Sequence, residues 1–170
     1  MPETSTFYPS PVGTILIKSS GEFISGLLFI NYDELQKVEN KLAITPSDND
    51  VLLNKCCQQL SEYFEGTRKE FDLPIQQNGT AFQQKIWLAL TQIPFGQTIS
   101  YMELSKRTGD TKAIRAVGST NGKNQLSIVV PCHRVIGING TLTGYSGGLW
   151  RKQWLLEHEA KIVHGLQMLF

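Results

Sequence analysis

The sequence has few cysteines and no long apolar run. Only three of its 170 residues are cysteine, and two of these, Cys56 and Cys57, are neighbours. An odd and partly adjacent set does not form a disulfide framework, so we expect a reducing, intracellular compartment. No apolar run approaches the ~18 residues of a membrane helix, and the first residues lack the basic and apolar segments of a secretory signal. We therefore expect neither membrane insertion nor export.

Internal repeats, low-complexity tracts and a strong net charge are also missing. The 41% apolar content and the mean hydropathy of −0.16 are typical of a folded globular protein, and the net charge of +1 excludes a histone-like polycation. The charge is nevertheless unevenly distributed. Residues 1–78 contain 6 basic and 11 acidic residues, whereas residues 79–170 contain 10 basic and 4 acidic ones. This asymmetry indicates a polyanionic partner for the basic half.

The first half predicts strands followed by a helix. Two β-rich runs, 14–19 and 24–30, flank a short polar stretch and predict a hairpin. A later series of apolar residues at helical spacing predicts a helix that Ser47 caps, with Asp50 in its first turn and Gly66 at its end.

A change in the sign of the charge marks the expected domain boundary. Residues 71–73 predict a short strand, and the polar, turn-like stretch 74–79 follows it. Because the charge changes sign at this stretch, we interpret it as a linker. The expected domains are residues 1–78, which include the linker, and residues 79–170.

Helices dominate the prediction for the second half. Thr80 begins a capping box, and Phe82 belongs to the expected buried stripe of the helix that follows. Residues 127–130 predict a short buried strand. Residues 149–158 predict a last helix, in which Trp150 is available for packing.

Two further helices form a candidate helix-turn-helix. Ser100 caps a helix of about two turns, and Asp110 caps another over 111–119 after a glycine break. Any pair of short helices around a glycine turn has the same pattern. The pattern by itself therefore leaves an ordinary helical hairpin open.

The segment with the clearest chemical meaning is Pro-Cys-His-Arg-Val at 131–135. A thiol reacts as its thiolate, and an adjacent base or cation lowers the cost of that charge. His133 and Arg134 supply both types of group. A Cys–His pair also matches two zinc ligands, but a closed zinc site needs about four at recognisable spacing. The alternative for Cys132 is a small buried hydrophobe, which is how we interpret the other two cysteines.

This segment closely resembles the active-site motif of the O6-alkylguanine-DNA alkyltransferases. Further blocks resemble that family in order and at compatible spacing, and the resemblance is strong over residues 80–160. These blocks are Ser100-Tyr101, Arg115-Ala-Val-Gly118, Asn124, Gly144-Tyr-Ser-Gly-Gly-Leu149 and Trp154-Leu-Leu-Glu-His-Glu159. The resemblance implies an α/β (α+β) protein. Its N-terminal domain would be ribonuclease-H-like, and its C-terminal domain a mostly helical, winged helix-turn-helix alkyltransferase domain.

The resemblance also implies DNA repair by irreversible, stoichiometric transfer of an alkyl group. The group would pass from O6-alkylguanine, and from O4-alkylthymine, in duplex DNA to Cys132 after nucleotide flipping. His133 would generate the thiolate through a water, and Glu159 would orient that imidazole. Tyr101 would hydrogen-bond guanine N3 and supply a proton, and Asn124 would hold the backbone around the site.

Further groups implied by the resemblance would hold the guanine. The carbonyls of Cys132 and Val135 would accept hydrogen bonds from its amino group. The backbone N–H of Ser146 would face O6, Tyr145 would close the pocket, and Gly147 would give the loop conformational freedom. We expect no cofactor and no metal, because the first 78 residues lack the histidines for the zinc site that some relatives carry.

The expected partner is double-stranded DNA, bound in the minor groove by a monomer in the cytoplasm, or in the nucleus of a eukaryote. Lys112 and Arg115 are three residues apart and share a helix face. The resemblance implies that Arg115 replaces the flipped nucleotide in the base stack. Contacts to phosphates would make binding salt-dependent. We expect these contacts from Lys85, Lys106, Arg107, Lys112 and Lys123.

Two alternatives from other classes remain open. One is a non-catalytic protein that binds alkyl lesions, although the presence of Cys132 argues against it. The other is a cysteine hydrolase of the Cys–His–carboxylate type, which would turn over repeatedly. Transfer of label from O6-methylguanine to a single cysteine distinguishes an alkyltransferase from both.

Overall fold

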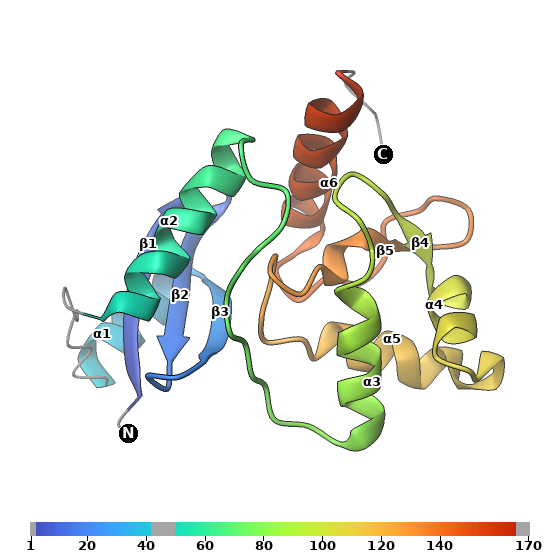
Figure 1. Ribbon diagram of the computed structural model, residues 1–170, viewed down its shortest axis with the longest axis horizontal. Helices are drawn as coiled ribbons and strands as arrows, with labels where there is room; N and C mark the ends of the chain where they lie inside the picture. The colour runs from blue at the N-terminus through green and yellow to red at the C-terminus, as the bar shows by residue number, and fades with distance from the viewer. Residues whose placement is uncertain (1–2, 42–49, 166–170) are drawn as a thin grey trace. The chain divides into compact units, whose positions relative to one another are not determined.

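The computed structural model describes residues 3–41 and 50–165, which belong to two compact units, Met1–Gln77 and Asn78–Phe170. Figure 1 traces the chain from blue at the N-terminus to red at the C-terminus. The first unit contains a sheet and helices, whereas the second is mainly helical. Each unit is described by itself below.

The first unit contains a three-stranded antiparallel sheet. Its strands β1 (Thr4–Ser10), β2 (Gly13–Ser19) and β3 (Ile24–Ile30) follow the order β1-β2-β3 (Figure 1). The predicted hairpin is confirmed as β2 and β3, while β1 was not predicted. The central strand β2 has three consecutive buried residues, Ile15–Ile17. Because successive side chains alternate between faces, both faces of β2 are covered.

Helix α1 (Tyr32–Lys41), which was not predicted, follows β3, and α2 (Val51–Glu65) packs on the sheet. The predicted end of α2 at Gly66 is confirmed, with a left-handed φ of 87°. Its start differs from the prediction. Asp50 is the N-cap, because its carboxylate accepts the N–H groups of residues 52 and 53, each at 3.0 Å. Ser47 lies outside the described residues.

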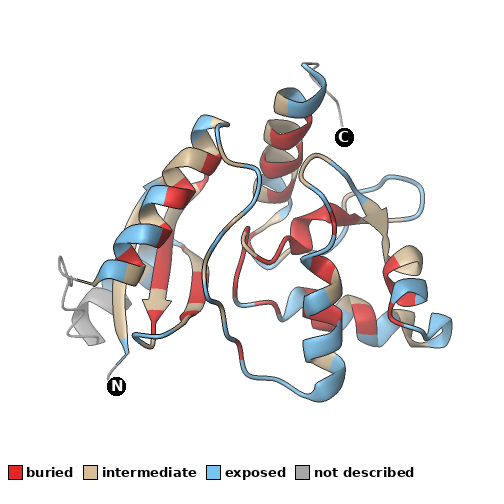
Figure 2. Cartoon of the chain, in the orientation of Figure 1, coloured by how far each residue is buried: buried red, intermediate tan, exposed pale blue. Residues whose placement is uncertain are grey.

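Helix α2 has buried positions, red in Figure 2, among exposed ones. Cys56 is one of its buried residues. Burial raises the pKa of this thiol to about 12, so Cys56 is a packing residue, as expected.

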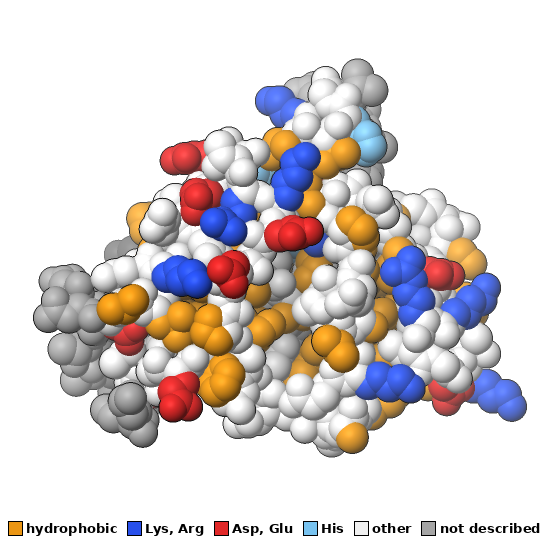
Figure 3. Space-filling model, viewed as in Figure 1, with side chains coloured by type: hydrophobic (Ala, Val, Ile, Leu, Met, Phe, Trp, Pro, Cys, Tyr) orange, Lys and Arg blue, Asp and Glu red, His pale blue; other side chains and the backbone are white. Residues whose placement is uncertain are grey.

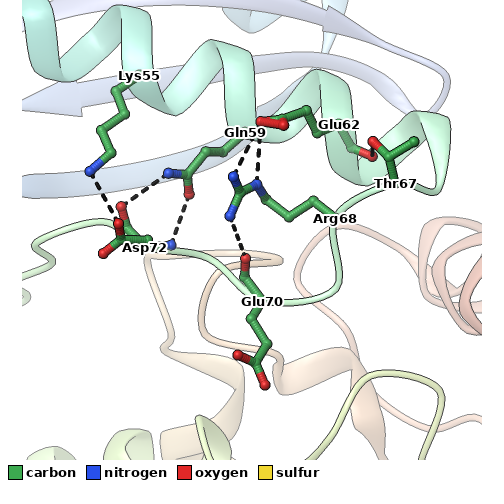
Figure 4. A network of polar contacts seen from close by, with 7 residues as sticks. All are labelled: Lys55, Gln59, Glu62, Thr67, Arg68, Glu70 and Asp72. Atoms are coloured by element: carbon green, nitrogen blue, oxygen red, sulfur yellow. Dashed lines mark hydrogen bonds and ion pairs between the residues drawn. The ribbon is translucent and has the colours of Figure 1, made fainter.

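The short strand predicted at 71–73 does not form. The backbone of Asp72 instead bonds to the side chain of Gln59 on α2, accepting from Nε2 at 3.0 Å and donating to Oε1 at 2.9 Å (Figure 4). A side-chain amide thus satisfies the groups that a strand partner would have used. Three residues after Asp72, Ile75 makes an isolated parallel bridge to Ile24 of β3.

Three capped helices form the core of the second unit. α3 (Ala81–Leu90) begins with the predicted capping box at Thr80. α4 (Tyr101–Arg107) has Ser100 as its cap. Asp110 caps the 3-10 turn η1 (Thr111–Ala113), which continues into α5 (Ile114–Gly122). The helix pair α4 and α5 is confirmed, and α5 ends three residues beyond the predicted end.

Aromatic residues of this unit depart from two expectations. Phe82 is 38% exposed, so its place in the buried stripe of α3 is wrong; Trp87 is buried there instead. The indole Nε1 of Trp87 donates to the carbonyl of Thr120 at 3.1 Å, which ties α3 to α5. Trp150 is 55% exposed and therefore not a core residue.

A short sheet and a long helix complete the second unit. β4 (Ile99–Ser100) and β5 (Val135–Ile136) pair in parallel. The last helix, α6 (Leu149–His164), extends six residues beyond its predicted end. The 3-10 turn η2 (Cys132–Arg134) precedes β5 directly and packs against α6.

Candidate active site

The turn η2 and helix α6 carry the candidate site. Cys132 and His133 are 3% and 0% exposed, and Arg134 is also buried. The buried face of α6 includes two ionisable residues, Lys152 and Glu159. They are seven positions apart, which is close to two turns at 3.6 residues per turn, so they share a face. Two successive residues of η2, His133 and Arg134, bond to Glu159 of this helix.

Asn124 fixes the turn that leads into η2. Its Nδ2 donates to the carbonyl of Val130 at 2.8 Å, and its Oδ1 accepts from the N–H of Leu126 at 3.1 Å. Between these points Ile128 has a φ of +72°, a left-handed conformation that costs roughly 1–2 kcal/mol. The strand predicted at 127–130 is therefore wrong. The segment turns because a side chain pairs the backbone groups that a strand would have used.

Glu159 is the centre of a buried polar cluster. Its Oε2 lies 2.6 Å from Nε2 of His133, and its Oε1 accepts from Nε of Arg134 at 2.8 Å. The backbone N–H of Gly96 donates to the same Oε1 at 3.1 Å. Nη1 of Arg134 donates to the carbonyl of Ile93 at 2.7 Å. The buried carboxylate is thus surrounded by donors, which a charge in the interior requires.

Burial and this cluster determine the protonation states. Burial alone would raise the pKa of Glu159, but His133 and Arg134 hold it well below its usual value. Burial lowers the pKa of His133, and Glu159 opposes that shift only in part. Nδ1 of His133 is buried and has no hydrogen-bond partner among the described residues. A neutral imidazole that donates from Nε2 to Glu159 keeps Nδ1 available to accept a proton.

The cation that acts on the Cys132 thiol is not the one that the motif suggested. Burial raises the pKa of this thiol, while the side chain of Asn124 and the charge of Lys152 oppose the rise. Arg134 instead directs its guanidinium to Glu159 and to a backbone carbonyl. The expectation that Arg134 supplies the charge beside the thiol is therefore wrong, and Lys152 is the cation whose charge opposes the rise in the pKa of Cys132.

The 143–148 loop is anchored at both of its ends. The carbonyl of Thr143 accepts from the hydroxyl of Tyr101 at 3.2 Å and from Nζ of Lys152 at 2.8 Å. The carbonyl of Gly147 accepts from Nη1 of Arg151 at 2.8 Å. The loop is therefore tied to α4 at its start and to α6 at both ends.

Two tyrosines lie within electrostatic reach of the thiol. Burial raises the pKa of Tyr101 and that of Tyr145, and the charge of Cys132 adds to both shifts. The structure thus brings Cys132, Tyr101 and Tyr145 together. Gly147 is buried and Ser146 is exposed in the loop beside them. Val135 is buried at the start of β5.

Sequence reasoning missed two supporting residues, Asn121 and Lys152. Nδ2 of Asn121 donates to the carbonyl of Cys132 at 3.3 Å, and the N–H of Val135 donates to the same oxygen. This carbonyl therefore already has two donors, which matches its two lone pairs. Lys152 had a recognisable signal, because it stands on the apolar stripe of α6 where a solvated lysine does not belong.

A basic surface follows one side of α5 and the turn before it. Lys112, Arg115, Ser119 and Lys123 recur at intervals of three or four residues, and all are exposed. Lys112, Arg115 and Lys123 form no ion pair with any described residue. A Cβ placed on Gly118 would lie 3.8 Å from the ring of Tyr101, so α5 also approaches the site.

Lys and Arg side chains also gather around α4, on the right of Figure 3. Among the described residues, no group of three His, Cys, Asp or Glu side chains is placed to hold a metal ion. No helix in the same residues is both long and apolar enough to cross a membrane.

Comparisons with known proteins cover both units. Residues 4–77 match the ribonuclease-like domain of 6-O-methylguanine DNA methyltransferase, and residues 81–161 match the DNA binding domain of the same family. A methylated-DNA–protein-cysteine methyltransferase of Methanosarcina acetivorans is 42% identical over 154 residues, which are 89% of this chain and 95% of the relative. The predicted combination of a ribonuclease-like α/β domain with a helical DNA-binding domain is confirmed.

Solved structures agree with these matches. The O6-methylguanine methyltransferase of Mycobacterium tuberculosis superposes with a TM-score of 0.82 at 38% identity, covering 94% of both chains. A structure of Mycobacterium tuberculosis OGT in complex with DNA has a TM-score of 0.77 at 37% identity, covering 94% of this chain and 93% of that one.

Proposed function

The chain belongs to the 6-O-methylguanine DNA methyltransferase family, and we propose that it repairs DNA by transferring the alkyl group of O6-alkylguanine to Cys132. One observation carries the choice of acceptor: a buried thiol adjoins a neutral histidine that a buried carboxylate holds through Nε2. The relatives support the reaction, since they are named cysteine methyltransferases. The structure of a relative in complex with DNA supports duplex DNA as the partner.

The transfer exchanges one bond to carbon for another. The sulfur of Cys132 attacks the alkyl carbon while the O6–carbon bond breaks, and the bonding electron pair stays on the guanine. The thiol proton passes through a water to Nδ1 of His133, and Glu159 stabilises the resulting imidazolium. The hydroxyl of Tyr101, which donates to the carbonyl of Thr143 when no base is bound, turns to guanine N3 and supplies a proton as charge develops there. The imidazolium of His133 then gives up its proton through solvent and Tyr101 regains one, so that overall the thiol proton replaces the alkyl group on the base.

The burial of the acceptor determines how a lesion reaches it. A cysteine that is 3% exposed is out of reach of a base inside a duplex, so the nucleotide must be flipped into the site. The carbonyl of Val135 then accepts from the guanine amino group, because the carbonyl of Cys132 already has two donors. The N–H of Ser146 faces O6, and Tyr145 closes the pocket, with Gly147 beside it in the loop.

The basic surface on α5 docks the DNA. Lys112 contacts phosphate, and Arg115 enters the minor groove and fills the gap in the base stack. Residues 79–170 form the DNA-binding and alkyltransferase domain, and residues 1–78 form the supporting N-terminal domain. The protein acts as a monomer without a cofactor, in the compartment that holds the DNA: the cytoplasm, or the nucleus of a eukaryote.

A labelled duplex tests this function directly. An equimolar mixture of the protein and DNA with a radiolabelled O6-methylguanine is followed by peptide mapping. We expect at most one label per chain, on Cys132, and none after Cys132→Ala. Cys57→Ala is the matched control and should accept label normally, since Cys57 lies on α2 of the other unit. A duplex with labelled O4-methylthymine tests the wider substrate range.

The other outcomes of this experiment identify the alternatives. Specific binding of the lesion without transfer of label would indicate a non-catalytic lesion-binding protein. Repeated turnover of an ester or peptide substrate, with no label retained, would indicate a hydrolase.

A further inference from the structure

The first turn of α6 carries cations where the start of a helix favours acidic residues. The helix follows Gly148, which offers no side-chain cap, and it begins with Leu149, Trp150, Arg151 and Lys152. No acidic residue lies in that turn. Because the unpaired N–H groups make the start of a helix electropositive, cations there cost stability. The position of Arg151 is therefore explained by contacts outside the helix rather than by the helix itself.

Arg151 reaches back from the helix to the loop that precedes it. Side chains of a helix tilt toward its N-terminus, so a residue of the first turn can meet that loop. Nη1 of Arg151 donates to the carbonyl of Gly147 at 2.8 Å. Gly147 is buried, so this bond satisfies an acceptor that solvent reaches poorly. The guanidinium thereby fixes the peptide unit between Gly147 and Gly148.

Trp150 contacts both the guanidinium and the loop. Its ring centre lies 4.6 Å from Cζ of Arg151, which is a cation–π contact. A Cβ placed on Gly148 would lie 3.4 and 3.5 Å from two atoms of the indole, so the ring lies next to this glycine. The N–H of Gly148 donates to the carbonyl of Tyr145 at 2.9 Å and closes a turn. Two side chains that follow this turn in the sequence thus restrain it.

The turn needs such a restraint because two of its residues are glycines. Gly147 and Gly148 lack side chains, so many backbone conformations are open to them. Gly148 adopts one of these, with a φ of +91°. Trp150 is 55% exposed, so it restrains the turn from the solvent side. The inner side of the turn remains available to a substrate.

We propose that Trp150 and Arg151 form a brace that fixes the turn 145–148 and thereby restricts the size of the alkyl group that the site accepts. The proposal rests on the function proposed above, in which the N–H of Ser146 faces O6 of the flipped guanine. The alkyl carbon is bonded to that oxygen, so the turn forms a wall beside the alkyl group. A fixed wall aligns a methyl group for attack and does not move aside for a larger one. Both side chains are positioning residues, since they act through the turn.

Two substitutions remove the brace in separate ways. Arg151→Met removes the hydrogen bond and the cation but keeps an unbranched side chain, and Trp150→Ala removes the indole. Trp150→Phe keeps an aromatic ring for the guanidinium. Lys161→Met is the matched control for the loss of a charge, because Lys161 is exposed on the same helix. Each protein is first compared without DNA, by amide hydrogen exchange of the peptide that contains residues 145–148.

Amide exchange reports on the brace itself. The N–H of Gly148 closes the turn, and its exchange should accelerate about tenfold or more in Arg151→Met and in Trp150→Ala, because the turn opens more often. Trp150→Phe and Lys161→Met should exchange like the unaltered protein. The thermal midpoint of Arg151→Met should change little, since removal of a cation from the start of α6 offsets the lost hydrogen bond.

Selectivity reports on what the brace does. Single-turnover transfer is measured from O6-methylguanine and from O6-benzylguanine in the same duplex. The ratio of the methyl rate to the benzyl rate should fall about tenfold in Arg151→Met and in Trp150→Ala, and Trp150→Phe should retain it. The double variant should fall no further than either single variant, because the two side chains act as one unit.

The two measurements together decide the proposal. Faster exchange with a lower rate ratio would support it. An unchanged rate ratio would overturn it, whether or not exchange accelerates. Equal slowing on both lesions with a lower thermal midpoint would also overturn it, because that is the effect of a residue that only supports folding. Failure of the proposed function would appear separately, as absence of transfer from either lesion by the unaltered protein, whereas exchange is measured without DNA.

Discussion

Glu159→Gln is the substitution that most sharply tests the buried cluster. The carboxylate accepts from Arg134, from Gly96 and from Nε2 of His133 within 3.1 Å, and its side chain is 1% exposed. Breaking a buried ion pair costs about 3–5 kcal/mol, because the remaining charge is left uncompensated. A glutamine keeps one oxygen as an acceptor for Arg134. We therefore expect a loss near the lower end, about 3 kcal/mol.

Urea unfolding followed by tryptophan fluorescence measures this loss where it occurs. All three tryptophans, Trp87, Trp150 and Trp154, belong to the second unit, so the signal reports on the unit that contains Glu159. Glu157→Gln is the matched control on the same helix. Its side chain is partly exposed and bonds to Gln153 at 3.0 Å. We expect it to change stability by no more than about 0.5 kcal/mol.

The pH dependence gives the prediction a sign. The folded-state pKa of Glu159 lies well below its unfolded value, which is ~4.3 in an unfolded chain. The carboxylate therefore contributes its full stability above that value, and the contribution is lost as the pH falls through the folded pKa. The difference between the original protein and Glu159→Gln should be largest near neutral pH and shrink on acidification. A loss below about 1 kcal/mol, or a difference independent of pH, would refute the account of the cluster.

Two further predictions concern the turn before η2 and the DNA surface. Asn124→Ala leaves the N–H of Leu126 unpaired and removes one of the two donors to the carbonyl of Val130. It should therefore cost about 1–3 kcal/mol in urea unfolding and slow methyl transfer; equal stability would contradict the role of Asn124. Arg115→Ala should weaken duplex binding and reduce the slope of log affinity against log salt by about 1. Lys69→Ala, an exposed change in the other unit, should leave that slope unaltered in a fluorescence anisotropy titration.

The helices of the second unit could be predicted because their signals are local. Thr80, Ser100 and Asp110 each accept a backbone N–H two or three residues later, so a window of a few residues contains the interaction. The same is true of Gly66, whose left-handed conformation ends α2. Asp50 was predicted in the first turn of α2 but is its N-cap. Aspartate is favoured at both positions, so the sequence does not distinguish them.

The elements that were wrong depend on side chains that lie outside the segments themselves. Residues 127–130 have the composition of a buried strand, but Asn124 bonds on both sides of Ile128 and turns the segment. Residues 71–73 also have strand composition, but Gln59, 13 positions from Asp72, occupies its backbone groups. Composition indicates that a segment is buried. It does not indicate which group pairs with its backbone.

The candidate site divides in the same way. Cys132 and His133 are consecutive, so their chemistry could be predicted from the motif. The destination of the Arg134 side chain could not, because the Ile93 carbonyl and Glu159 are 41 and 25 positions away. Lys152 was overlooked because a lysine on a helix is ordinarily solvated. Its place on the stripe of Leu155, Leu156 and Glu159 is the feature that distinguishes it.

The raised pKa of Cys132 suits an acceptor that can be used once. A thiolate exposed to solvent reacts with any electrophile or oxidant, and each such event would consume the protein. Burial keeps the sulfur protonated and out of contact with solvent. The compensating groups, His133 with Glu159 and also Lys152, are equally buried. The rate of alkyl transfer therefore depends on delivery of the alkylated guanine to the site rather than on the intrinsic nucleophilicity of the thiol. We expect that a variant exposing Cys132 would react faster with small reagents and survive for a shorter time.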